Sequence, residues 1–444
     1  MSNTPDISVV IVSRDRPGDL RKMLACLRFQ DISGFETIVV TNTPGALEGA
    51  RHPAPLRLFD CDEANISVAR NVGLAAAKGR YIAFCDDDAL PDPSWLRHLL
   101  GPFQNPEIGG SGGFTRGRNG ISLQWGAVET DTLGVAHPLG IAPDAAPVVF
   151  APATEKAPVM IGTNCAFRAS ALRQIGGFDP VFAYFLDDSD ISLRLSKAGW
   201  HLAIVPLAQV HHGFAAGPYR AQNRVPKTLQ PHGKSKAVFC RKHAPETALG
   251  PALDAFKTLQ HNRLDAQLLA GLMPPPALPA LIKSLERGFG EGRGLKLGPM
   301  PLGPRPDSEP APLITDSPKN HVLLVGRRSD TAWLENKGKT LADGGVMVTA
   351  LTLSRSPAFM QVGFSDQGFW QQSGGQFGKS GRDEPGFKWR TLRQKAALEV
   401  ARLAPTRPVD FVVYPQKQKE GDIFLPQNGV MSCINGFKVE SVLE

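Results

Sequence analysis

Residues 65–88 read NISVARNVGLAAAKGRYIAFCDDD, a helical pattern followed directly by a strand pattern. The first part predicts a helix over Ile66–Ala77, and Gly79 stands where a helix-ending glycine is expected. The apolar run Tyr81–Cys85 predicts a strand. Three aspartates, Asp86–Asp88, come directly after that strand. In an open α/β sheet, ligands bind at the carboxyl ends of the strands, so these acids fall at a predicted site.

The alternation of strand and helix continues on both sides of this segment. Upstream, Ile7–Val12 is an apolar, β-branched run that predicts a buried strand, and Pro17 can open a helix at its first position. A second strand is expected at Phe35–Val40, and Asp92 caps the helix that follows the three aspartates. This order predicts an α/β fold that is Rossmann-like, with a mainly parallel sheet and flanking helices.

The pattern weakens after residue 108. Residues 109–158 are rich in Gly, Pro and Ala, which predicts loops and short strands that shape a pocket. Strand and helix patterns return further on, at Val159–Phe167, Ala171–Ile175, Ser189–Ala198, Leu202–Val205 and Gln209–His211.

The chain has 444 residues, enough for two or three domains of ordinary size. We expect a first domain over residues 1–250 and a helical extension over 251–287. Residues 288–318 are rich in Gly and Pro, which predicts a linker. A second β-α-β pattern begins at His321 and predicts a smaller Rossmann-like α/β unit over 319–444, here named the C-terminal unit.

Composition excludes several classes of protein. Hydrophobic residues make up 42% and charged residues 20%, an ordinary globular mixture. No apolar run approaches the ~20 residues of a membrane-spanning helix, and the first residues lack the pattern of a signal peptide, so we expect a cytoplasmic protein. Six scattered cysteines without a C-x-x-C pair argue against a zinc ribbon or a disulfide framework.

The net charge of +7 and the pI of about 9.1 are mildly basic. They do not indicate a dedicated nucleic-acid binder, so no nucleic-acid partner is expected. They suit an anionic small substrate or peripheral association with the inner face of a membrane. A surface kept basic for solubility explains them equally well.

The cluster Asp86–Asp88 is a candidate cation site. Adjacent like charges repel, so such a cluster is costly without a cation, and its hard oxygen ligands suit Mg²⁺ or Mn²⁺. The alternative is a solvated acidic turn before Pro91. The position directly after a predicted buried strand favours the cation site.

A second acidic group and a histidine pair follow later in the chain. Asp187, Asp188 and Asp190 open the predicted helix, where a helix cap explains one aspartate but not two adjacent ones. His211 and His212 end a predicted strand. They are either metal ligands or ordinary buried histidines.

Together these motifs resemble family 2 glycosyltransferases with the GT-A fold. The resemblance rests on residues 65–88 and on the runs GTNCAFR, GGFDP, DDSDISLRLSKAGW and HH between Gly162 and His212. It covers about Ile7–Gly213, roughly half of the chain. It implies an inverting enzyme that moves a sugar from a nucleotide-diphosphate donor, of the UDP type, to a glycan or lipid-linked acceptor with the help of Mn²⁺ or Mg²⁺.

The resemblance also implies roles for single residues. Asp188 would be the general base beside Asp187, because the acceptor hydroxyl must lose a proton as it attacks. Asp88 would be the main metal ligand, and the metal would neutralise charge on the leaving diphosphate. The metal site would be completed by Asp86 and His211, and the nucleotide sugar would be bound by Ser13, Arg14, Thr41, Arg70, Asp86 and Asp87.

One position departs from the family pattern. The family usually has an aspartate at the end of the second strand, where this chain has Thr41. A threonine is neutral and cannot accept the same charge-assisted hydrogen bond from a nucleobase. The sequence therefore predicts the fold more precisely than it predicts which nucleotide is bound.

The C-terminal unit carries two weaker signals. From His321 onward it resembles the N-terminal, acceptor-side half of GT-B glycosyltransferases. It would bind an acceptor or a partner, or else be a piece of a longer two-enzyme chain. The run SGGQFGKS, Ser373–Ser380, lacks the first glycine of a phosphate-binding P-loop, so we interpret it as a flexible basic loop.

Two other functions stay open at this point. A nucleotidyltransferase of related fold usually has a Gly-rich phosphate loop after the first strand, where this chain reads SRDRP at residues 13–17. A sugar-binding or nucleotide-binding scaffold without catalysis would not need both acidic groups.

Overall fold

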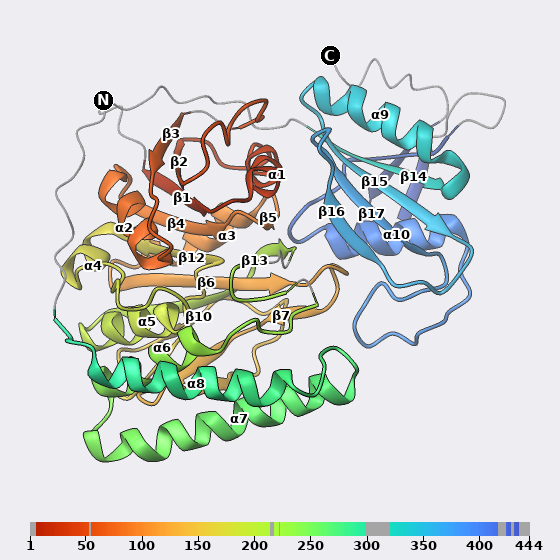
Figure 1. Cartoon of the computed structure of the whole chain (residues 1–444). Helices are drawn as coiled ribbons and strands as arrows, with labels where there is room; N and C mark the ends of the chain where they lie inside the picture. The colour runs from red at the N-terminus through yellow and green to blue at the C-terminus, as the bar shows by residue number, and fades with distance from the viewer. Residues whose placement is uncertain are drawn as a thin grey trace.

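The computed structural model describes residues 6–52, 55–213, 217–221, 223–298, 320–415, 423–427 and 430–434. Figure 1 shows a large N-terminal α/β body, a pair of long helices packed along it, and a smaller α/β unit at one side. In the part of the chain described, no helix is both long and apolar enough to cross a membrane.

The large sheet has the strand order β3-β2-β1-β4-β12-β6-β13-β10, with β5 added to β13 and β7 to β6. β1 pairs in parallel with β2 and β4, whereas β12 is antiparallel to both β4 and β6. The prediction of a mainly parallel α/β sheet is confirmed. The strands are β1 (Ile7–Ser13), β2 (Phe35–Thr41), β3 (Leu56–Asp60), β4 (Tyr81–Asp86), β5 (Ala89–Pro91), β6 (Ile108–Arg116), β7 (Leu123–Trp125), β10 (Val148–Phe150), β12 (Asn164–Arg168) and β13 (His201–His212).

Helices cover both faces of this sheet. In β1, Val10 points into one apolar core and its neighbours Val9 and Ile11 into the other. Alternate side chains of a strand face opposite sides, so a strand covered on both sides is apolar throughout. The covering helices are α1 (Pro17–Leu27), α2 (Ile66–Ala76), α3 (Trp95–Leu100), the 3₁₀ turn η1 (Gly101–Gln104), α4 (Ala169–Gln174) and α5 (Asp187–Lys197).

Residues 109–158 hold more regular structure than expected. β6 is a central strand although it contains Gly109, Gly110, Gly112 and Gly113. A Cβ at Gly113 would lie 2.0 Å from the Ala208 carbonyl oxygen, so these glycines permit close packing and do not mark a loop. A small second sheet also forms here, in the order β11 (Lys156–Pro158), β8 (Val128–Asp131) and β9 (Ala136–Pro138).

The two short strands predicted near residues 202 and 209 form one long strand. β13 runs from His201 to His212, and its pairing with β6 is irregular between Val205 and Gln209. The interrupted apolar pattern reflects this irregularity.

The helical extension is longer than predicted. It comprises α6 (Gln230–His243), η2 (Glu246–Ala248), α7 (Leu249–Leu269) and α8 (Ala277–Gly294). A Cβ at Gly288 would lie 2.1 Å from the Gln230 carbonyl oxygen, so α8 needs glycine where it meets α6. The predicted start of the linker at residue 288 therefore falls inside α8, because these glycines serve helix packing. Residues 299–318 of the predicted linker lie outside the described residues.

The C-terminal unit contains the expected smaller α/β sheet. β14 pairs in parallel with β15 and β18. The segment Ser373–Gly375, the start of the predicted flexible loop, belongs to strand β17. The elements are β14 (His321–Arg327), η3 (Arg328–Asp330), α9 (Thr331–Asp343), β15 (Met347–Ser354), β16 (Gln361–Phe364), β17 (Trp370–Gly375), α10 (Leu392–Leu403), β18 (Phe411–Val413), β19 (Ile423–Gln427) and β20 (Val430–Ile434).

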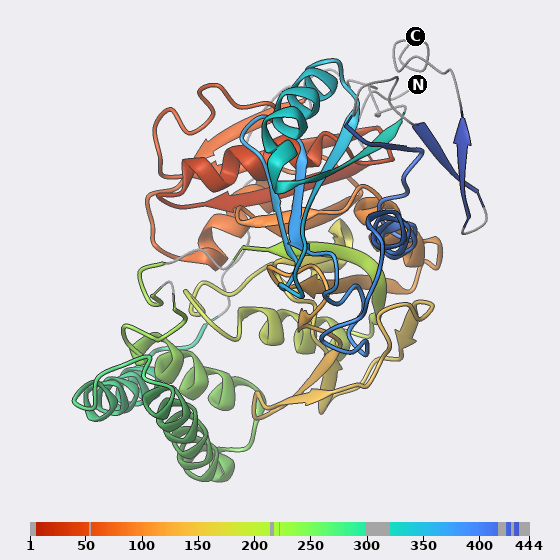
Figure 2. The ribbon, with the colours of Figure 1, turned by 90° about the vertical axis from the view of Figure 1, so that its right-hand side faces the viewer.

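The C-terminal unit packs directly on the N-terminal sheet. Figure 2 views the molecule from the side on which this unit lies. Cys26 of α1 and Phe29, just beyond its end, share a buried apolar cluster with Phe364 and Trp370 of the unit. Arg51 also forms an ion pair with Asp343 at 2.6 Å. A continuous apolar contact therefore joins the two sheets.

Candidate functional site

Asp86, Asp88 and His212 come together at the carboxyl end of β4. Their nearest side-chain oxygen and nitrogen atoms all lie within 4.8 Å of one another. The backbone explains this meeting, because β5 pairs antiparallel with the end of β13 and the Gly213 amide donates to the Asp88 carbonyl at 2.8 Å. We name Asp86, Asp88 and His212 the acidic group.

The two adjacent histidines have different surroundings. His212 Nε2 lies 3.2 Å from Asp88 Oδ1, whereas His211 Nε2 lies 3.3 Å from Asp92 Oδ2. Successive side chains of a strand point to opposite faces, so only one of the two can face the acids. The sequence suggested His211 as the ligand, and the structure places His212 there instead.

Gln124 of β7 fixes the orientation of the His212 ring. Its Oε1 lies 2.9 Å from His212 Nδ1. An amide oxygen only accepts, so Nδ1 carries a proton, and in the neutral ring the lone pair is on Nε2, which faces the acids. This is the usual arrangement around a metal-binding histidine. No sequence signal singled out Gln124.

Asp87 has a structural position between β1 and β4. The Ser13 hydroxyl donates to its Oδ2 at 2.7 Å, and Arg16 approaches its Oδ1 at 2.5 Å. Its side chain is fully buried, and this burial raises the pKa of Asp87 to about 8 against the pull of Arg16. Asp87 thus connects the two strands. Arg16, which the sequence reading did not single out, keeps 31% of its side chain exposed beside the acidic group.

Arg70 of α2 connects the two sets of aspartates. Its guanidinium forms an ion pair with Asp187 and lies 3.3 Å from Asp188 Oδ1 and 3.7 Å from Asp86 Oδ1. Burial alone would lower the pKa of Arg70, but these carboxylates outweigh it and raise the pKa. A Cβ at Gly162 would lie 2.0 Å from the guanidinium, which explains the glycine of the GTNCAFR run.

Asp187 and Asp188 begin α5 after a strained turn. Phe185 and Leu186 have φ angles of 72° and 64°, a left-handed conformation that is uncommon outside glycine. Such strain concentrates at functional sites. Asp188 keeps 26% of its side chain exposed against 10% for Asp187. Desolvation by the surrounding groups, and next the charge of Asp187, raise the pKa of Asp188 well above its ordinary value.

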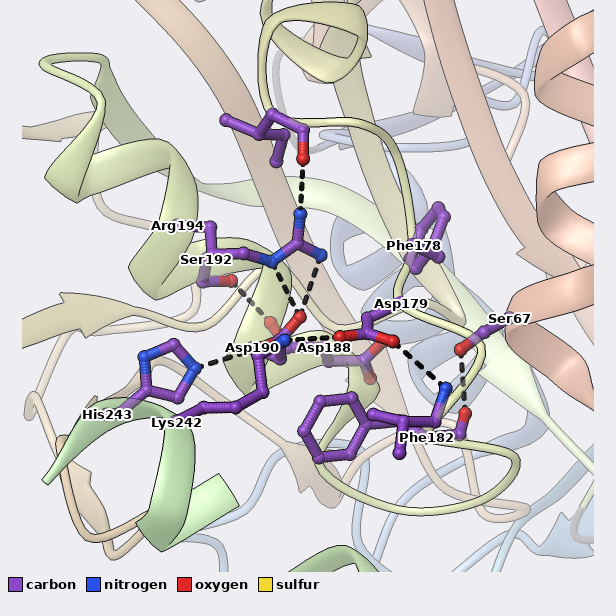
Figure 3. A network of polar contacts seen from close by, with 12 residues as sticks. Ser67, Phe178, Asp179, Phe182, Asp188, Asp190, Ser192, Arg194, Lys242 and His243 are labelled. Carbon is purple, nitrogen blue, oxygen red and sulfur yellow. Dashed lines mark hydrogen bonds and ion pairs between the residues drawn. The ribbon is translucent and has the colours of Figure 1, made fainter. Parts of the chain in front are cut away.

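Asp190 holds α5 against α6 and takes no part in the acidic group. Figure 3 shows Arg194, Lys242 and His243 directed at its carboxylate, at 2.7, 2.7 and 2.9 Å. Burial opposes the charge of Asp190, but Arg194 and its neighbours dominate and lower the pKa. Of the three acids at this helix start, Asp187 and Asp188 are therefore the candidates for chemistry.

The remaining predicted residues contact neighbouring loops. Arg14 donates to the Asp62 carbonyl at 2.8 Å. Thr41 is buried, and its hydroxyl accepts from the Thr43 amide at 3.2 Å. Thr163, in contrast, donates to Asp86 Oδ2 at 2.6 Å and so orients one member of the acidic group.

The donor set of the acidic group fits a divalent cation. Two carboxylates and one imidazole nitrogen converge, and the ring has the hydrogen bond expected of a metal ligand. A carboxylate of raised pKa, Asp188, belongs to the neighbouring acids that Arg70 connects to this group. The arrangement can hold an anionic ligand through a cation and accept a proton nearby.

Comparison with known proteins finds glycosyltransferases of similar sequence. A model of the family "Glycosyl transferase family 2" matches residues 8–176. The chain is 30% identical over 219 residues to a pre-mycofactocin glycosyltransferase of Mycobacterium tuberculosis, covering 47% of this chain and 42% of that protein. It is 28% identical over 227 residues to the O-antigen biosynthesis protein RfbC of Myxococcus xanthus, covering 48% and 18%. The chain thus spans less than half the length of these relatives.

Solved structures give weaker matches. One is GalNAc-T7 with UDP, GalNAc and Mn²⁺, with a TM-score of 0.40 and 16% identity, covering 53% of this chain and 49% of the other. Another is the mannosyltransferase PcManGT from Pyrobaculum calidifontis with GDP-Man and Mn²⁺, with a TM-score of 0.39 and 15% identity, covering 65% and 87%.

Proposed function

We propose that this chain transfers a sugar from a nucleotide diphosphate to an acceptor hydroxyl. Its residues 8–176 match the model of family 2 glycosyltransferases. The observation that carries the proposal is the meeting of Asp86, Asp88 and His212 beside the Asp187–Asp188 pair. One set of groups can hold the leaving diphosphate through a cation, and the other can take the proton of the acceptor.

A divalent cation would be held by the acidic group. Mg²⁺ is bound mainly through oxygen, so the imidazole of His212 favours Mn²⁺. When bound, the metal would supply positive charge for the diphosphate as it leaves. Arg16 lies beside Asp88, 3.5 Å from Oδ2, and its partly exposed guanidinium can bind a second phosphate oxygen.

Asp188 is the proposed general base. Its carboxylate is more exposed than that of Asp187 and lies farther from the Arg70 guanidinium. A raised pKa makes Asp188 a better proton acceptor than an ordinary aspartate. A base separate from the phosphate-binding acids fits a single displacement with inversion, since the acceptor then attacks opposite to the leaving group.

The donor and acceptor are proposed at the level of class. We infer a UDP-type nucleotide sugar and a glycan or lipid-linked acceptor, in agreement with a relative named for O-antigen biosynthesis. The net charge of +7 would favour peripheral association with an anionic inner membrane face.

A thermal-shift screen tests this function. Nucleoside diphosphates and UDP-sugars are added with Mn²⁺, with Mg²⁺ and with chelator. A ligand that binds the folded state raises its stability by RT ln(1 + [L]/Kd), so the correct nucleotide should raise Tm only in the presence of metal. Hydrolysis of the same donor without acceptor should then be detectable. If no nucleotide shifts Tm under any of these conditions, the proposed function is wrong.

A further inference from the structure

The strand pair β5–β13, which positions Asp88 and His212 of the acidic group, is a short ladder with two ends. At one end, the Gly213 amide donates to the Asp88 carbonyl at 2.8 Å, and at the other the Asp92 amide donates to the Gln209 carbonyl at 3.0 Å. β5 and β13 pair between these two bonds. The position of His212 relative to Asp88 therefore depends on how this ladder is held.

The C-terminal unit holds the Asp92 end. Arg407 is fully buried, and its Nε lies 3.7 Å from Asp92 Oδ1, while Asp92 Oδ2 contacts His211. The guanidinium stacks 3.8 Å above the ring of Trp370, and that ring meets His211 edge-on at 5.3 Å. We name Asp92, His211, Arg407 and Trp370 the closed cluster. Its two C-terminal members cover the face of the ladder opposite to the acidic group.

The same unit also reaches the Gly213 end. Arg118 donates from its side chain to the Gly213 carbonyl at 2.7 Å, and its own carbonyl accepts from the Val362 amide of β16 at 2.7 Å. Arg402 of α10 donates to the Gly120 carbonyl at 3.1 Å, in the turn that follows Arg118. Both ends of the ladder are therefore tied to the C-terminal unit.

Loss of the contact between Arg407 and Asp92 should disturb the ladder most. Asp92 is 2% exposed, and a buried carboxylate is strongly unfavourable when its cation is lost or no longer held in place. The backbone can reduce that cost by letting water reach Asp92, which moves His211. Because His211 and His212 are consecutive residues, such a movement displaces His212 Nε2 from the aspartates.

We propose that Arg407 is a positioning residue for the acidic group, so that the C-terminal unit is part of the metal-binding site and not a separate appendage. The inference rests on the proposed function because it assumes a bound metal. The ordering of the ladder by Arg407 follows from the described contacts alone.

The test uses the full chain and a matched pair of variants. Arg407→Lys keeps the charge but loses the planar contact with Asp92 and Trp370. Arg390→Lys is the control, because Arg390 is equally buried but contacts Glu384 and the Gly378 carbonyl within the C-terminal unit. Two quantities are measured: Mn²⁺ affinity by electron paramagnetic resonance, and hydrogen exchange of residues 201–213 without metal or donor.

Arg407→Lys should weaken Mn²⁺ binding about tenfold or more, as loss of a group that orients a metal ligand does. It should also speed exchange in β13, whereas Arg390→Lys should leave both quantities close to those of the unchanged protein. If Arg407→Lys does not fold, Trp370→Phe takes its place, and a smaller loss in the same direction is expected.

The outcomes separate the two proposals. If the wild-type protein binds no Mn²⁺, the metal of the proposed function is wrong. Hydrogen exchange in β13 then decides whether Arg407 orders the ladder. Exchange that matches the Arg390→Lys control overturns the inference. Faster exchange with unchanged Mn²⁺ affinity also overturns it, because Arg407 would then stabilise the ladder without positioning the site.

Discussion

Each face of the ladder brings an aspartate beside a histidine, Asp88 with His212 in the acidic group and Asp92 with His211 in the closed cluster, yet the two environments differ. The Asp88 and His212 side chains are 4% and 5% exposed, close to the 2% and 3% of Asp92 and His211. The difference lies at Asp86, whose side chain is 27% exposed and gives the acidic group an open edge. Arg407 and Trp370, which both belong to the C-terminal unit, cover Asp92 and His211 in the closed cluster. An aspartate beside a histidine is therefore a ligand site on one face and a structural contact on the other.

Charge balance separates the two regions further. Around the acidic group, five carboxylates lie near two guanidinium groups, those of Arg16 and Arg70, and Asp88 also contacts His212. In the closed cluster, one carboxylate faces one guanidinium and one imidazole. An excess of negative charge with an exposed edge can take up a cation, and a balanced buried set cannot.

The largest expected effect is the loss of Asp88. Asp88→Ala should lower transfer by about 10³-fold, because the metal contributes several kcal/mol to stabilising the leaving group. Stabilisation by nucleotide with Mn²⁺ should disappear with it. Asp366→Ala, at a side chain that is 85% exposed, is the control and should change neither measurement. Transfer that continues undiminished in chelator would contradict the metal role.

The next effect concerns the proposed base. Asp188→Asn keeps the shape of the side chain and should reduce transfer by roughly 10²–10⁴-fold, the usual contribution of general-base catalysis. Donor affinity, measured by calorimetry, should stay nearly unchanged. If Asp187→Asn abolishes transfer and Asp188→Asn has little effect, the two aspartates have been assigned the wrong way round.

A smaller effect is expected at Gln124, which contacts the acidic group only through His212. Gln124→Leu removes the acceptor for Nδ1–H and should weaken Mn²⁺ binding about tenfold, whereas Gln124→Glu, which retains an acceptor, should not. Equal affinities for the two variants would show that the ring needs no such support.

The last and smallest effect per unit of pH is on stability, and it concerns His321 in the C-terminal unit. His321 is buried between Thr349 and the Pro408 carbonyl, and this burial lowers its pKa to about 3. The unfolded chain then binds more protons between about pH 3 and 6.5, so stability is fully present above pH 6.5 and falls on acidification. Urea unfolding should show a loss of about 1.4 kcal/mol per pH unit below 6.5. His321→Gln should flatten that slope, and an unchanged slope would rule out this histidine.

The sequence predicts the buried strands well and the glycine-containing elements poorly. β1, β2 and β4 are continuous apolar runs, and their observed bounds lie within a residue of the predicted ones. The sequence predicts loops and short strands where β6 lies, and linker where α8 ends beyond residue 287, because the glycines there look like turn signals. In the fold, those glycines allow backbones to approach closely, which depends on partners far away in the sequence.

The candidate site shows the same limit. Acids after a strand predict a ligand site, and Asp86 and Asp88 lie there. Which histidine faces them depends on the irregularity of β13 between Val205 and Gln209, where residues 206–208 have no partner in β6, since an odd number of extra residues reverses the alternation of side chains. Arg407 could not be predicted at all, because nothing local distinguishes it. A cut near residue 290 would pass through α8 and also remove this arginine.

The most direct test of the central claim is an Mn²⁺ titration of two adjacent variants, His212→Asn and His211→Asn. The claim is that the acidic group holds the cation and the closed cluster holds the fold. His212→Asn should abolish tight Mn²⁺ binding with little change in Tm. His211→Asn should lower stability by about 1–3 kcal/mol, the cost of leaving Asp92 poorly paired. The folded protein should still bind Mn²⁺, about tenfold more weakly because the ladder is disturbed. If His211→Asn abolishes Mn²⁺ binding in folded protein and His212→Asn leaves it intact, the account is contradicted.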